Sequence, residues 1–243
     1  MKIVFVDFYL IICCLSFISC GKSGEKLYEE FQKVYVENDS TFTLEAFKLL
    51  EKSAELHFPE ALYTLGKYYK DEEDSETKSV MYFQEAAKYN HSKSQYIISE
   101  YYDDESNDSL SLYWLKRSAE NGYSEAQYDL ADYYDDEDDE LNYIYWLKKA
   151  VEGDNLDAIA DLADYYQEKD SINAMMELYD KGIMLGSSRM YYLKSVFFMR
   201  MDEKEKAFEL MKYAADKGFD PAISMLGLFY YYGYGIDEDA KKA

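Results

Sequence analysis

Six copies of one pattern of apolar and polar positions follow each other along the chain, 31 to 33 residues apart. Each copy closes on aromatic residues, as in AQYDLADYY at Ala126–Tyr134. The fifth position of every copy is a branched aliphatic residue: Leu65, Ile98, Leu130, Leu162, Leu193 and Leu226. A fixed period of this length is typical of a repeat architecture.

A second series of apolar positions runs in phase with the first. Two adjacent columns hold large residues: Leu49 and Leu50, Tyr82 and Phe83, Trp114 and Leu115, Trp146 and Leu147, Leu178 and Tyr179, Leu210 and Met211. Smaller residues follow at Ala54, Ala87, Ala119, Val151, Ile183 and Ala215. Three residues later, Asn90, Gly122, Gly186 and Gly218 favour the left-handed backbone that ends a helix, and His57 and Asp154 take this place in the other copies.

Apolar residues at three- and four-residue spacing predict amphipathic helices. Each repeat is therefore expected to be a helix A, a turn, a helix B and a short loop. A two-helix unit cannot bury both its faces, so the repeats must stack on one another. We predict six A–B pairs between Thr43 and Tyr231, with a further amphipathic helix at Glu25–Glu37 covering the first pair.

The final copy reads YYYGYGIDEDAKKA at Tyr230–Ala243. It resembles the Sel-1-like repeat pattern Y-x-x-G-x-G-V-x-x-D-x-x-K-A, with Ile236 in place of valine. The other half of that pattern, W-[YL]-x-K-A-A-x-x-G, is similar to WLKRSAENG at Trp114–Gly122 and WLKKAVEGD at Trp146–Asp154. The resemblance to this family, a relative of the tetratricopeptide repeats, implies an all-α fold: an α/α superhelix, a right-handed solenoid of about six helix-turn-helix repeats.

The first residues form a separate segment. Residues 1–19 have the charge and apolar run of a secretory signal, and Phe17–Cys20 resembles a bacterial lipobox, in which Cys20 is the lipidation site. Phe17 and Asp7 depart from the usual pattern, so an ordinary signal peptide or an uncleaved anchor are the alternatives. We expect a tether at 20–26, a capping helix and linker at 27–42, and the repeats at 43–243. This implies a bacterial cell envelope protein that is lipid-anchored and either periplasm-facing or surface-exposed.

Charge and cysteine usage narrow the function. The chain has 26 Lys plus Arg against 49 Asp plus Glu, a formal net charge of -23, which argues against nucleic-acid binding and favours a basic partner. The three cysteines, Cys13, Cys14 and Cys20, all lie in the N-terminal segment, so the repeats contain neither a cysteine nucleophile nor a cysteine metal site.

The repeats show no catalytic constellation, and neither a metal site nor a cofactor is predicted. His57 and His91 fall at matching turns, which a repeat alone would produce. The acidic runs come closest to a site, and the candidate residues of an acidic ridge are Asp103, Asp104, Asp135, Asp136, Glu137, Asp138 and Asp139. They fit solvated turns between helices, an acidic ridge that docks a basic protein, or a poor calcium loop that lacks the central glycine.

The leading hypothesis is a non-enzymatic, membrane-tethered scaffold that binds a protein or peptide, which the family resemblance implies. By analogy with related solenoids, the A helices would line the concave face. The candidate partner-binding residues are Tyr113, Lys116, Arg117, Tyr145, Lys148 and Lys149. The alternatives are a cell-envelope enzyme or hydrolase-associated factor, and an acidic cation-binding surface protein.

Overall fold

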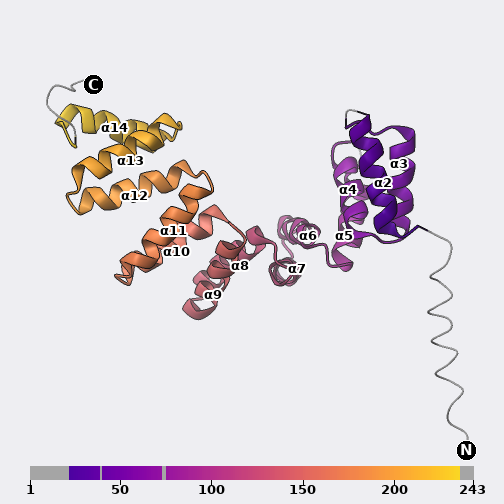
Figure 1. Cartoon of the computed structure of the whole chain (residues 1–243). Helices are drawn as coiled ribbons and strands as arrows, with labels where there is room; N and C mark the ends of the chain where they lie inside the picture. The colour runs from indigo at the N-terminus through magenta and orange to yellow at the C-terminus, as the bar shows by residue number, and fades with distance from the viewer. Residues whose placement is uncertain (1–21, 39, 73–74, 236–243) are drawn as a thin grey trace, which may run out of the picture. The chain divides into compact units, whose positions relative to one another are not determined.

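The computed structural model describes residues 22–38, 40–72 and 75–235, and over these residues the fold is all-α, with helices joined by turns (Figure 1). Its helices are α2 (Gly24–Glu37), α3 (Leu44–Glu55), α4 (Pro59–Lys70), α5 (Glu76–Lys88), α6 (Ser92–Asp104), α7 (Asp108–Glu120), α8 (Ser124–Asp136), α9 (Glu140–Glu152), α10 (Leu156–Glu168), α11 (Ile172–Met184), α12 (Ser188–Arg200), α13 (Lys204–Asp216) and α14 (Asp220–Tyr232). The predicted signal at 1–19, Cys20 and the terminal stretch 236–243 lie outside the described residues.

The predicted solenoid elements are confirmed. Helices α3 to α14 form six A–B pairs, and their outer bounds, Leu44 and Tyr232, lie within one residue of the expected ones. The even-numbered helices from α4 onward are the B helices, and the odd-numbered ones are the A helices. Each B helix packs along the following A helix, as α4 does on α5 and α12 on α13.

The chain divides into two compact units, residues 1–121 and 122–243. In the first unit, Leu50, Leu65, Phe83 and Ile98 from the predicted columns are almost fully buried. In the second unit, the core holds Leu130, Leu147, Leu162, Tyr179 and Met211. Two of the columns, those that start at Leu50 and at Leu65, therefore supply most of each core, although Leu115, Leu193 and Leu226 are only half-buried. The adjacent column that starts at Leu49 is mostly half-buried.

One turn geometry ends nearly every helix. After α8, Asp138 adopts a φ of 57°, its N–H donates to the Asp135 carbonyl, and the Asp139 N–H donates to the Tyr134 carbonyl at 2.8 Å. This is the Schellman arrangement, which satisfies carbonyls at the helix end. The residues with a positive φ in the A-to-B turns are those predicted: His57, Asn90, Gly122, Asp154, Gly186 and Gly218.

The B-to-A turns use the same device, which the sequence analysis did not foresee. Ser106, Asp138, Asp170 and Asp202 take the left-handed position there. The next residue caps the following helix in two of these turns: Asn107 Oδ1 accepts from the Leu110 N–H, and Asp139 Oδ1 accepts from the Asn142 N–H. Short polar residues suit both positions, because they tolerate a left-handed backbone and cap helix N-termini.

The N-terminal boundary needs a correction. We expected the tether to run to residue 26, but α2 begins at Gly24, because Ser23 caps the helix by accepting from the Lys26 N–H. Helix α2 packs on the first repeat as predicted. The Ser53 hydroxyl donates to the Gly24 carbonyl at 2.6 Å, and the Phe31 side chain is buried.

Candidate functional site

The predicted partner-binding residues of the first unit lie on α7. The Tyr113 side chain is 48% exposed and meets the Trp114 ring edge to face, with centroids 5.1 Å apart. The Arg117 guanidinium donates to Asn90 Oδ1 at 2.7 Å, so it braces the preceding turn, and Lys116 is half-buried. Of these three side chains, Tyr113 offers the largest contact surface.

The matching residues of the second unit lie on α9. Tyr145 is 51% exposed and meets Trp146 edge to face. Lys148 is exposed, whereas the Lys149 ammonium pairs with Glu152 at 2.7 Å. Three of the six predicted residues therefore lie on α7 in the first unit, and the other three lie on α9 in the second.

The two tryptophans belong to the packing. Trp114 lies against the buried cluster of Phe83, Ala87 and Ile98, and Trp146 lies against the core of the second unit. This position agrees with the interpretation of both residues as part of a repeat column.

The acidic run at Asp135–Asp139 divides between helix and turn. Asp135 and Asp136 form the last turn of α8, and Asp103 and Asp104 do the same in α6, which corrects our placement of all four in a loop. Glu137, Asp138 and Asp139 make the turn itself, and Asp139 caps α9. Hydrogen bonds from Asn142 lower the pKa of the Asp139 carboxyl. The structure of the turn therefore explains why aspartate occurs at 138, where the backbone is left-handed, and at 139, where the side chain caps α9.

The histidines have structural partners. His91 Nδ1 accepts from the Ser94 N–H at 3.1 Å at the start of α6, and its ring stacks on Tyr63 with centroids 4.6 Å apart. Burial lowers the pKa of His91. His57 stacks on Tyr89 with centroids 4.9 Å apart. Within residues 22–38, 40–72 and 75–235, no group of three or more His, Cys, Asp or Glu side chains is placed to hold a metal ion.

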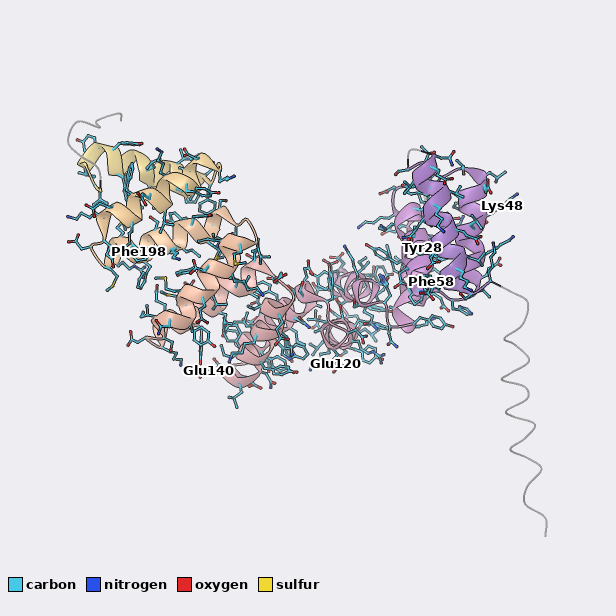
Figure 2. The ribbon with its side chains drawn as sticks, viewed as in Figure 1. Tyr28, Lys48, Phe58, Glu120, Glu140 and Phe198 are labelled. Atoms are coloured by element: carbon cyan, nitrogen blue, oxygen red, sulfur yellow. The ribbon has the colours of Figure 1, made fainter. Side chains whose placement is uncertain are left out.

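An open groove that the sequence analysis missed lies between α2 and α4, with a volume of 650 Å³. We call it the aromatic groove. Its lining comes from two helical stripes with the same spacing: Tyr28, Phe31, Gln32, Tyr35 and Val36 on α2, and Thr64, Lys67, Tyr68, Asp71 and Glu72 at and just after α4, with Phe42 from the linker. Tyr28 projects from α2 in the first unit (Figure 2).

Ring contacts hold the aromatic groove in shape. The Phe42 ring meets Tyr35 and Tyr68, each with centroids 4.9 Å apart, and also stacks near Phe31. The Tyr28 hydroxyl bonds Thr64 Oγ1 at 2.9 Å and so joins the two walls. Val36 is 69% exposed at the rim. The groove is therefore a preformed, partly apolar surface, the usual character of a ligand site.

The second unit has a groove of 440 Å³ at corresponding repeat positions, which we call the acidic groove. The five lining residues of α4 and its C-terminal turn correspond, three repeats later, to Asp161, Asp164, Tyr165, Glu168 and Lys169 of α10 and its turn. Asp135, Glu140 and Tyr143 complete it, and Glu140 is marked in Figure 2. The same repeat positions thus form a groove in each unit, and their chemistry differs.

Crowded carboxyls set the electrostatics beside the acidic groove. Partial desolvation and the neighbouring Asp161 raise the pKa of Asp132 to about 6. Desolvation raises the pKa of Tyr143 to about 12. The negative charge of Glu140 is balanced, because its carboxylate pairs with the Lys169 ammonium at 2.9 Å. The same carboxylate also accepts from the Tyr165 hydroxyl at 3.0 Å.

No helix in the described part of the chain combines the length and the apolar character needed to cross a membrane. No curated protein sequence matches the chain.

Two solved structures share the fold. A protective antigen from uropathogenic Escherichia coli strains, which displays an SLR fold, is 22% identical with a TM-score of 0.69. The match covers 88% of this chain and 51% of the antigen, so the chain spans about half of the antigen's length. A Sel1 repeat protein from Oxalobacter formigenes is 19% identical with a TM-score of 0.70, over 88% of this chain and 96% of that one.

The family model described as Sel1 repeat matches residues 43–58, 59–91, 92–123, 124–140, 183–219 and 220–243. The intervening stretch from α9 to α11 keeps the same helix lengths and three-residue turns. Sel1 repeats are commonly non-catalytic and form scaffolds for protein–protein interactions. The matched residues, the helix pairs and the two solved structures agree, and the chain belongs to the Sel1 repeat family.

Proposed function

We propose that this chain is a non-catalytic scaffold that holds a protein or peptide, and that the aromatic groove is its binding surface. The observation that carries the proposal is the partly exposed wall of Tyr28, Tyr35, Tyr68 and Val36 along an open groove of 650 Å³. Aromatic and apolar groups gathered on the surface of a chain with a net charge of -23 are typical of an interaction site.

The groove suits binding because its walls are fixed before a partner arrives. The Tyr28–Thr64 hydrogen bond and the Phe42 ring contacts already order its lining. A preformed surface spends less conformational entropy on association than a flexible one. The A-helix residues around Tyr113 and Tyr145 remain predicted as further contact points for the same or another partner.

Site-specific photo-crosslinking tests the scaffold. A photoreactive residue at Gln32, which lines the groove, is compared with one at Lys33, the adjacent exposed residue outside the lining. We expect one partner to be captured from position 32 and not from position 33, and the purified partner to bind the unmodified chain. Capture of the same proteins from both positions, or no binding by the purified partner, overturns the proposal.

We also propose that the chain is tethered to a membrane of the bacterial envelope through Cys20. The lipobox-like Phe17–Cys20 stretch supports this. Labelling with a palmitate analogue should mark the natural chain and leave Cys20→Ala unlabelled, with Cys14→Ala as the matched control. Equal labelling of the natural chain and Cys20→Ala rules the anchor out.

A further inference from the structure

We infer that the aromatic groove takes a short peptide segment that carries an aliphatic or aromatic anchor next to lysine or arginine. This rests on the proposed scaffold function and names the chemistry of its partner. The groove has an apolar part and a charged end, and each part selects one feature of the segment.

The apolar part selects the anchor. Phe42 is 36% exposed and Val36 69% exposed, and both border the half-buried rings of Tyr28, Tyr35 and Tyr68. An apolar side chain placed between these groups would exchange water for ring surface on several sides. Such burial is favourable in proportion to the apolar area removed from water.

The charged end selects the cation. Asp71 and Glu72 line the groove where α4 ends, and both are exposed. The C-terminal carbonyls of a helix carry partial negative charge and add to the attraction for a cation. Burial and the neighbouring Glu72 raise the pKa of Tyr68 further above its ordinary value.

The lining contains one cation, and its position leaves the acidic end dominant. The Lys67 ammonium lies 4.8 Å from the centroid of Tyr63, a ring that is outside the lining. The two negative charges of Asp71 and Glu72 exceed the single positive charge of Lys67, so this end of the groove has a net negative charge. A glutamate-bearing segment would meet net repulsion there, whereas a lysine-bearing one would be attracted.

The spacing limits the length of the segment. From Tyr28 to Val36 the α2 stripe rises about 12 Å, at roughly 1.5 Å per helical residue. An extended segment covers that distance with about four residues, at roughly 3.3 Å each. One anchor and one or two basic residues therefore fill the groove.

Fluorescence anisotropy with the full chain tests the inference. The probe is a labelled nine-residue peptide with a central tryptophan followed by two lysines, and the matched peptides carry glutamates for the lysines or alanine for the tryptophan. We expect the first to bind about tenfold more tightly than either control, which corresponds to roughly 1.4 kcal/mol. Equal affinity for the lysine and glutamate peptides overturns the inference.

Two variants place the binding in the groove. Glu72→Lys should reverse the preference between the lysine and glutamate peptides, whereas Glu120→Lys, on exposed α7 surface in the same unit, should not. Val36→Ser should weaken the tryptophan peptide, whereas Leu44→Ser, at a 72% exposed residue of α3, should not. All four sites are exposed, so the folds should survive. An unchanged preference in Glu72→Lys contradicts the assignment.

The outcomes separate the two proposals. Cross-linking from Gln32 without any preference among the peptides overturns the inferred chemistry and leaves the scaffold function standing. Peptide selectivity together with no partner captured from Gln32 overturns the scaffold function and leaves the groove's chemistry standing.

Discussion

The Tyr28 hydroxyl of α2 bonds Thr64 Oγ1 of α4 at 2.9 Å, across the floor of the aromatic groove. In the second unit, Tyr128 of α8 makes the corresponding bond to Asp161 Oδ2 of α10 at 2.8 Å. Thr64 and Asp161 occupy the same repeat position, so in each unit a tyrosine of another helix bonds this position: Tyr28 from the N-terminal helix α2 in the first unit, and Tyr128 from the preceding B helix in the second. The apolar columns did not reveal either bond.

Removing the Tyr28–Thr64 hydrogen bond should cost little stability. Thr64 Oγ1 also donates to the Glu60 carbonyl, so Tyr28→Phe leaves Thr64 with a partner. We expect a loss of about 1 kcal/mol in the free energy of unfolding, measured by urea denaturation. Tyr231→Phe, at a 70% exposed residue of α14, is the control and should change nothing. A loss as small as the control's would show that the hydrogen bond contributes no stability.

The turn after α8 should respond to backbone preference. Asp138 has a φ of 57°, so Asp138→Gly should keep or raise the melting temperature, whereas Asp138→Val should lower stability by about 1–2 kcal/mol. Thermal unfolding of the two variants measures this. A fall in stability with Asp138→Gly would mean that the carboxylate, and not the turn geometry, determines the residue at this position.

Stability should fall as pH rises through the range set by Asp132. Its folded pKa, about 6, lies above the ordinary aspartate value of 3.8, so the folded state binds the proton more tightly. The stabilisation is complete below about pH 4 and is lost as pH rises through about 6. Because solvent screens this exposed side chain, we expect an effect of about 1 kcal/mol.

Asp132→Asn tests this dependence. The variant should raise stability at pH 7.5 and flatten the change between pH 4 and pH 6, as measured by denaturation at each pH. Asp104→Asn, at an exposed residue of α6, serves as the control and should leave the profile unchanged. The same pH profile in Asp132→Asn and the natural chain would contradict the assignment.

Two glycines within helices should respond in opposite directions to alanine. A Cβ at Gly66 in α4 would lie 2.6 Å from the Phe83 ring, so Gly66→Ala should cost about 1–3 kcal/mol. A Cβ at Gly227 in α14 would have no atom within 4 Å, so Gly227→Ala should stabilise by up to about 1 kcal/mol. Calorimetric unfolding measures both, and a destabilised Gly227→Ala would contradict the open space found around Gly227.

The fold was largely predictable because each buried position of the repeat occurs in six copies, and most of these copies carry an apolar residue there. A column such as Leu65, Ile98 and Leu130 identifies the same buried position in successive copies. One residue that does not fit the pattern therefore does not change the prediction of a helix. The A-to-B turns were equally clear, since glycine and asparagine occur at a fixed distance from a small residue. The B-to-A turns were predicted as polar loops, but their left-handed residue was missed, because an aspartate at that position cannot be distinguished from its acidic neighbours in the sequence.

The grooves could not be predicted from the columns. Their lining residues sit on the exposed side of the B helices, where each copy has different side chains, such as Thr64 against Asp161. The analogy with related solenoids drew attention to the A helices instead. A comparison of the exposed B-helix positions between copies would have found the shared spacing, although not the walls that α2 and Phe42 add.

The division of each repeat into buried columns and variable groove positions also affects how such a protein changes over generations. In the proposed binding role, substitutions at the groove positions would alter what is bound and leave the columns intact, so a new specificity would not require a new fold. Because the three-residue turns close each module in the same way, a module can be duplicated or deleted without redesigning its neighbours. Under the proposed function, a lineage would therefore diversify its partners by changing one groove at a time.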